Sequence, residues 1–237
     1  MGGDSVSHGK EALAQLIYET DRKMSGEETV RLLMEAVGSI KSIYEMNRDD
    51  LQTEHGIPKS VSEMIDLIDD IGRCVLRDNF PDNPMIANCG CAAEYLQALM
   101  YGRHVEYCYL MLLDAKGRMI ACPLMQRGTI DRSAVYAREL ALKAIRLKAK
   151  YAVMAHNHPG GTLEASQADV KTTHAAMEAM NAVNVVMLDH LIIAGREYTS
   201  IRKAGTPAEK IWQMQNPKDK LLLTFIKTNA PEKGGRK

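Results

Sequence analysis

Apolar residues recur at helical spacing through the first third of the chain, where Leu13, Leu16 and Ile17 form one such group. Residues three or four positions apart share one face of a helix, so this spacing predicts amphipathic helices that pack together. Glycine and proline interrupt the pattern at residues 53–60, which is typical of a turn between two helices. The pattern therefore predicts a small all-α domain over residues 1–77.

The chain changes character at residues 78–84, whose sequence DNFPDNP combines two prolines with asparagine and aspartate. Such residues favour turns over regular elements, so we interpret this segment as a linker between two domains. Short apolar runs then alternate with helical patterns. Strands are expected at residues 105–113, 119–124, 151–155, 183–193 and 198–201, and helices at 92–100, 132–150 and 166–181.

This alternation predicts an α/β layer architecture for a second domain at residues 85–205. Residues 206–237 form a C-terminal extension with one apolar stretch, and its last residues are expected to be frayed.

Composition and charge narrow the class of protein. Hydrophobic residues make up 46% of the chain and charged residues 25%, as in globular domains, and no apolar run is long enough to span a membrane. Thirty basic residues balance thirty acidic ones, which removes the strongest sequence argument for nucleic acid as the main partner. The start of the chain lacks the apolar segment of a secretory signal, and the five cysteines lack Cys-x-x-Cys spacing. Both features predict the cytoplasm.

Residues 156–169, HNHPGGTLEASQAD, concentrate side chains that bind metals. His156 and His158 are two positions apart at the end of a predicted strand, so both side chains point to the same face. A proline and two glycines then turn the chain, which allows Asp169 to return to the same place. Two imidazoles and one carboxylate leave the fourth tetrahedral position of zinc open to water, as in catalytic sites. The segment predicts one Zn²⁺ per chain.

These residues also have a simpler interpretation. Ser166 and Asp169 have the spacing of a helix capping box, in which each residue bonds to the backbone of the other. Two histidines on a strand can equally lie at the surface or pack in the core. Each feature alone favours the simpler interpretation, but their joint occurrence favours a metal site.

The pattern His156-x-His158-Pro, six residues, then Ser166-x-x-Asp169 resembles the JAMM motif of JAB/MPN-domain metallopeptidases. The segments HNHPGG at residues 156–161 and LDHLII at residues 188–193 resemble sequences of the bacterial RadC family. The resemblance covers about residues 11–205. It implies a cytidine-deaminase-like fold with a mixed β-sheet and flanking helices. It also implies zinc as cofactor and a peptide, isopeptide or similar amide as substrate.

The same resemblance implies two catalytic roles. Glu106 matches the glutamate that opens the first strand and acts as general base on the attacking water. Ser166 matches the residue that donates a hydrogen bond to the tetrahedral oxyanion. Spacing alone assigns neither role.

The resemblance also includes Gly56-Ile57-Pro58, which falls where related proteins carry a helix-hairpin-helix turn of the form Gly-Ile-Gly. Pro58 replaces the second glycine, which normally helps the backbone to approach a DNA phosphate. An alternative function is therefore a DNA-associated accessory protein whose helical domain binds DNA and whose JAMM domain is regulatory. Asp189 and His190 have two open interpretations, as a second layer of residues around a zinc ligand or as a satisfied buried polar pair.

Overall fold

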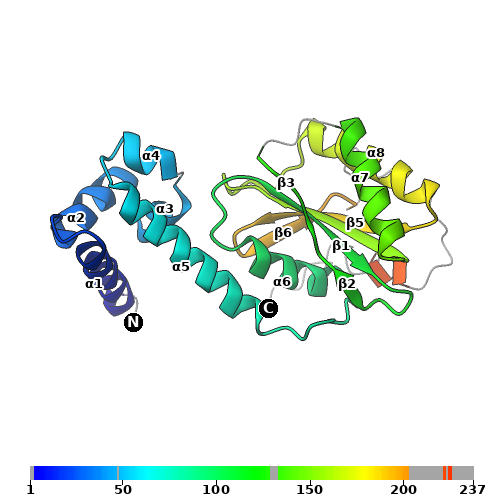
Figure 1. Cartoon of the computed structure of the whole chain (residues 1–237), viewed down its shortest axis with the longest axis horizontal. Helices are drawn as coiled ribbons and strands as arrows, with labels where there is room; N and C mark the ends of the chain where they lie inside the picture. The colour runs from blue at the N-terminus through cyan, green and yellow to red at the C-terminus, as the bar shows by residue number, and fades with distance from the viewer. Residues whose placement is uncertain (1–2, 47, 129–132, 203–220, 223, 226–237) are drawn as a thin grey trace, which may run out of the picture. The chain divides into compact units, whose positions relative to one another are not determined.

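The computed structural model describes residues 3–46, 48–128, 133–202, 221–222 and 224–225 (Figure 1). These residues fall into two compact units, with the division after Cys74 and with Gly102–His104 belonging to the first unit. The predicted linker lies within the second unit, and the domain limits stay a prediction. No helix in the described part of the chain combines the length and apolarity needed to cross a bilayer.

Helices form the N-terminal region, as predicted. They are α1 (Gly3–Thr20), α2 (Gly26–Val37), α3 (Ile40–Glu45), α4 (Arg48–Thr53) and α5 (Lys59–Arg77). Ser25 caps α2 by accepting a hydrogen bond from the Glu28 amide, and Gly38 ends that helix with a left-handed φ of 83°. Leu13 and Ile17 are buried with Leu33 and other apolar residues in the core of this unit.

The predicted turn between α4 and α5 is present. Gly56 takes a left-handed φ of 63°, and Ile57 is buried in the core. The carbonyl of Pro58 accepts hydrogen bonds from the amides of Val61 and Ser62, so this residue flanks the start of helix α5 at Lys59.

A mixed sheet organises the second unit. Its strands are β1 (Tyr107–Leu113), β2 (Met119–Ala121), β3 (Leu124–Arg127), β4 (Tyr151–Asn157), β5 (Val186–Ala194) and β6 (Glu197–Ser200). The order is β2-β1-β4-β5-β6, with β3 also paired to β1. The β4–β5 pair is parallel, and the other described pairs are antiparallel.

Helices cover both faces of this sheet (Figure 1). Helix α6 (Cys89–Met100) packs on one face, where Met111 and Val153 lie in the same core cluster. Helices α7 (Ser133–Arg146) and α8 (Gln167–Ala182) pack on the other face, with Leu110 and Met154. Strands buried on both faces read as continuous apolar runs, which explains why β1 and β4 lack alternation. The predicted α/β class with a mixed sheet and flanking helices is confirmed.

Local backbone features correct three predicted boundaries. The predicted strand at residues 119–124 is two strands, β2 and β3, because residues 122–123 fall outside both ladders with β1. Pro123 has no amide hydrogen to donate, although its carbonyl accepts a hydrogen bond from the Leu110 amide. Helix α7 ends at Arg146, where Lys148 takes a left-handed φ of 52°. Strand β5 starts at Val186 rather than at residue 183, because Asn184 is also left-handed. The C-terminal extension lies mostly outside the described residues, but Leu222 and Phe225 are buried in the core beside α6.

Candidate metal centre

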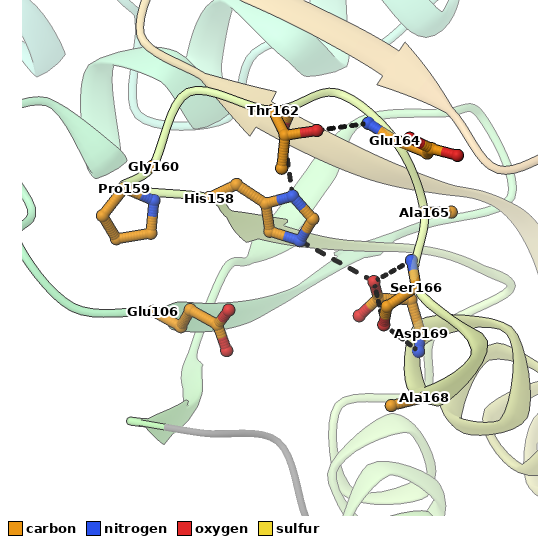
Figure 2. A pocket seen from close by; sticks show the side chains of 10 residues that line it. All are labelled: Glu106, His158, Pro159, Gly160, Thr162, Glu164, Ala165, Ser166, Ala168 and Asp169. Atoms are coloured by element: carbon orange, nitrogen blue, oxygen red, sulfur yellow. Dashed lines mark hydrogen bonds and ion pairs between the residues drawn. The ribbon is translucent and has the colours of Figure 1, made fainter.

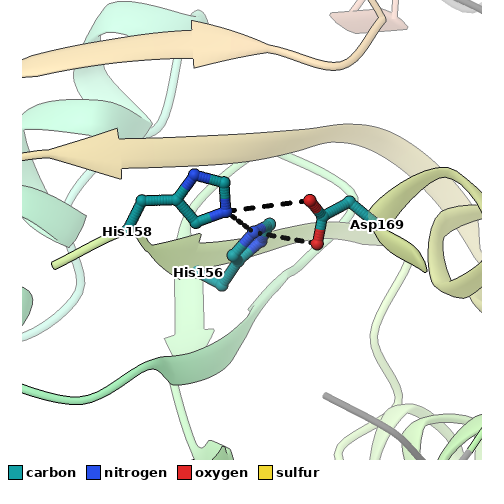
Figure 3. Close-up of side chains that lie close together, drawn as sticks. All are labelled: His156, His158 and Asp169. Atoms are coloured by element: carbon teal, nitrogen blue, oxygen red, sulfur yellow. Dashed lines mark hydrogen bonds and ion pairs between the residues drawn. The ribbon is translucent and has the colours of Figure 1, made fainter. Parts of the chain in front are cut away.

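The structure brings the three predicted metal ligands together (Figure 3). The Nε2 atom of His156 lies 2.9 Å from Nε2 of His158 and 3.1 Å from Oδ1 of Asp169. The Nε2 atom of His158 lies 3.7 Å from Oδ2 of Asp169. Nitrogen and oxygen ligands of a tetrahedral zinc ion are roughly 3.3 Å apart, and these separations bracket that value. The group could therefore hold a metal ion.

Strand β4 and helix α8 position this group. His156 and His158 are alternate residues at the end of β4, so both face the side of the sheet that α8 covers. The chain turns immediately afterwards, because the Gly161 amide donates to the His158 carbonyl and Gly161 takes a left-handed φ of 80°. Asp169 then lies in the first turn of α8.

A surface pocket of about 540 Å³ opens onto the group (Figure 2). His158, Asp169, Ser166 and Glu106 all line this pocket. His156 is fully buried behind them, with no exposed surface. A molecule that enters the pocket would therefore meet His158 and Asp169, while His156 lies behind them.

The hydrogen bonds of His158 determine which nitrogen is available as a ligand. Its Nδ1 atom lies 3.0 Å from the carbonyl oxygen of Thr162. A carbonyl only accepts, so Nδ1 carries the proton and donates. The Nε2 atom, which faces Asp169, is thus left to bind a proton or a metal ion.

Asp169 serves both predicted interpretations at once. Its amide donates to Oγ of Ser166 at 3.1 Å, and its Oδ2 accepts from the Ser166 amide at 2.8 Å, which completes a capping box. The Ser166 hydroxyl also donates to Oδ2 at 2.7 Å. The second carboxylate oxygen, Oδ1, faces His156. One oxygen caps the helix while the other remains available to a metal, so the two interpretations are compatible.

Charge in the centre follows from the same geometry. Burial alone would raise the pKa of Asp169, but hydrogen bonds with His156 and His158 outweigh it and hold that pKa far below its usual range. The hydrogen bond with Asp169 raises the pKa of His158 against the opposing effect of burial. The centre thus strongly favours a positive charge, which a proton or a metal ion can supply.

The strand register places Glu106 beside the histidines. Strands β1 and β4 are antiparallel, with Cys108 opposite His156. Glu106 lies two residues before Cys108, and His158 lies two residues after His156. In an antiparallel pair these two positions are opposite each other and on the same face of the sheet. Figure 2 shows the Glu106 carboxylate directed into the pocket that His158 and Asp169 line. Position and access therefore suit a base, and the assignment of that role stays a prediction.

Asn157 is a residue whose contribution the sequence did not reveal. It lies between the two histidines and points to the opposite side of β4. Its Oδ1 accepts from the amide of Tyr107 at 2.8 Å, and its Nδ2 donates to the carbonyl of Val105 at 3.1 Å. These two bonds bracket Glu106 and hold its backbone. The sequence signal for this role was an asparagine at the end of a predicted strand. Its side chain offers a hydrogen-bond donor and an acceptor, whereas a hydrophobic side chain offers neither.

A second group of possible ligands, Asp66, Asp69 and His104, lies in the first unit. The guanidinium of Arg48 occupies it, with Nε 2.8 Å from Asp66 and Nη2 2.8 Å from Asp69. The same Nη2 lies 2.5 Å from Nε2 of His104. Arginine remains charged in proteins, so this cluster already contains its cation and is an ion-pair network.

Comparison with known proteins agrees with this geometry. A family model described as a RadC-like JAB domain matches residues 86–206. A UPF0758 protein of Bordetella parapertussis is 31% identical over 173 residues, which cover 73% of this chain and 77% of the relative. A UPF0758 protein of Neisseria meningitidis is 29% identical over 203 residues, covering 86% and 90%. The chain therefore belongs to the RadC family of JAB/MPN-domain proteins.

Proposed function

We propose that this protein is a zinc-dependent amide hydrolase of the JAMM type, which cleaves a peptide, isopeptide or similar amide bond. The observation that carries the proposal is the convergence of His156, His158 and Asp169 at one side of an open pocket, with Glu106 opposite His158. Membership of a JAB-domain family supports a hydrolase in general terms. The substrate class and the metal are our inference from the donor set.

The donor set favours a catalytic zinc site over a structural one. Structural zinc sites are usually closed by four protein ligands, several of them cysteines, whereas catalytic sites have three protein ligands and an open position. Here two imidazoles and one carboxylate converge, and the pocket gives access to them. Zinc, when bound, would polarise the substrate carbonyl and lower the pKa of a nucleophilic water to about 7.

Glu106 would move the protons of the reaction. Its carboxylate would accept a proton from the attacking water and pass it to the nitrogen of the leaving amine. Ser166 would supply a hydrogen bond to the oxyanion, for which its hydroxyl must leave Oδ2 of Asp169. The Ser166 amide keeps its own bond to Oδ2, so the cap of α8 would survive this change. Association of the helical region with DNA stays a prediction. The geometry of the metal centre supports hydrolysis and gives no evidence for or against DNA binding.

Zinc content and turnover test the proposal. Protein purified without added metal should contain about one equivalent of zinc, and His156→Ala should contain less than about a tenth, because one ligand of three is lost. Glu106→Gln should retain zinc but lose turnover about 100-fold or more on a panel of peptidyl-aminomethylcoumarin amides. Glu139→Gln, an exposed change of the same chemistry on α7, serves as the control. Equal turnover of Glu106→Gln and wild type at equal zinc content would refute the role of Glu106.

Stability should depend on pH in opposite ways with and without zinc. The folded pKa of His158 is raised, so protonation stabilises the metal-free protein below the unfolded value of about 6.5, and this stability is lost as pH rises through the folded value. Asp169, whose pKa is depressed, stays ionised throughout the range from about pH 5.5 to 8 and adds no slope there. Zinc needs the unprotonated imidazole. The increase in Tm on adding zinc should therefore grow with pH, and a constant increase across this range would contradict the proposal.

Asn157→Ala should lower kcat about 10- to 100-fold with zinc content unchanged, because Glu106 would lose the two hydrogen bonds that bracket its backbone. Asn181→Ala, at an exposed position in α8, is the matched control and should retain full kcat. A normal kcat for Asn157→Ala would show that the backbone of Glu106 is held by other contacts, such as the hydrogen bond from Gly128.

A further inference from the structure

His190 is a fully buried histidine next to the metal centre. It lies in β5, and the parallel pairing of β4 with β5 sets it close to the end of β4. Its Nε2 atom is 2.8 Å from Nδ1 of His156, the nitrogen that faces away from the other ligands. Its Nδ1 atom is 2.5 Å from Oγ1 of Thr173 in α8. Both ring nitrogens are thus engaged, one toward a metal ligand and one toward the helix that carries Asp169.

Thr173 determines the direction of these hydrogen bonds. Its hydroxyl oxygen lies 2.6 Å from the carbonyl oxygen of Asp169, four residues earlier in the helix. A carbonyl has no proton to give, so the single hydroxyl proton of Thr173 must lie in this bond. The hydroxyl oxygen can then only accept from Nδ1 of His190.

The remaining proton positions follow. His190 has no exposed surface, and neither of its ring nitrogens is hydrogen-bonded to a carboxylate, so a charged ring would bear an uncompensated desolvation cost. A neutral ring with its proton on Nδ1 has an acceptor at Nε2. The proton between the two histidines must therefore belong to Nδ1 of His156, since the alternative sets two lone pairs against each other at 2.8 Å.

We propose that His190 and Thr173 are positioning residues that hold His156 in the tautomer with its proton on Nδ1, leaving the lone pair of Nε2 directed at the metal position. The relay runs from His156 through His190 and Thr173 to the backbone of Asp169, so it joins the first metal ligand to the third. It fixes the orientation of the buried imidazole and its distance from helix α8. The role toward the metal rests on the proposed zinc site, whereas the tautomer of His156 is a property of the chain alone.

The neighbouring Asp189 has a separate role, which resolves one question that the sequence left open. Its carboxylate accepts hydrogen bonds from the Ser200 hydroxyl at 2.8 Å and from the His190 amide at 2.7 Å. These bonds tie β5 to β6 and do not involve either ring nitrogen of His190. The two residues therefore have different roles: His190 contacts the metal centre, and Asp189 joins strands β5 and β6.

His158 uses a different support, which makes the relay specific to His156. Its Nδ1 donates to a backbone carbonyl in the adjacent loop, at Thr162. A ligand held by a local loop carbonyl does not depend on the packing of α8 against β5. Loss of the Thr173 hydroxyl should therefore leave the hydrogen bond that supports His158 intact.

Nitrogen-15 NMR of the imidazole rings tests the tautomer directly. In metal-free wild type, long-range proton–nitrogen spectra should show a proton on Nδ1 of His156, because Nε2 of His190 can only accept in the bond between the two rings. The His156 signals are assigned by their absence in His156→Gln. A His156 ring without a proton on Nδ1 would overturn the proposal.

Two variants of Thr173 test the effect on the metal. Thr173→Val keeps the shape of the side chain without its hydroxyl and should weaken zinc binding about 10- to 100-fold, measured by competition with a chelator. Thr173→Ser restores the hydroxyl and should return the affinity to within about threefold of wild type. A Thr173→Val protein that is folded and binds zinc as tightly as wild type would also overturn the relay.

The two proposals can fail separately. If wild type binds no zinc but shows His156 protonated on Nδ1, the relay stands and the hydrolase proposal fails. If wild type binds one zinc and cleaves amides but Nδ1 of His156 carries no proton in the metal-free protein, the relay fails and the hydrolase proposal stands.

Discussion

Strand β4 lies between β1 and β5, and the hydrogen bonds along its two edges set the positions of the residues around the centre. Pairing with β1 places Glu106 opposite His158. Pairing with β5 places His190 beside His156. A register slip of one residue would turn the side chains of a strand to the other face and separate these groups. Burial of β4 on both faces makes such a slip costly, because it would exchange the residues packed against α6 with those packed against α7 and α8.

The first turn of helix α8 supplies one side chain, Asp169, that both caps the helix and faces the other candidate metal ligands. Asp169 caps the helix with one carboxylate oxygen and faces His156 with the other. The cap holds the carboxylate in place before any metal arrives, so part of the entropy of ordering the ligand is lost during folding rather than during binding. Thr173, four residues after Asp169, bonds to the Asp169 carbonyl and to His190. It therefore links the first turn of the helix to the buried histidine.

The sequence was sufficient for features that depend on local spacing. The two-residue separation of His156 and His158 predicts a common face because alternate strand side chains share one side, and Ser166-x-x-Asp169 predicts a cap because the geometry is confined to one turn. The helical and α/β character of the two regions also follows from local periodicity.

Features that depend on pairing between distant segments could not be predicted from spacing. The position of Glu106 relative to His158 requires the β1–β4 register, and the bonds of Asn157 to Val105 and Tyr107 cross about fifty residues of chain. The division at Pro123 was missed because the apolar run continues through it, although the proline was a usable signal. The direction of the bond between His156 and His190 depends on one hydroxyl proton of Thr173, which no pattern of residue types encodes.

We propose that two imidazoles and one carboxylate hold a zinc ion with one position open. X-ray absorption at the zinc edge, on protein loaded with one equivalent of zinc, measures this coordination most directly. We expect four nitrogen or oxygen neighbours at about 2.0–2.1 Å, with the multiple scattering of two imidazole rings. A sulfur neighbour at about 2.3 Å, or a shell without imidazole, would contradict the account.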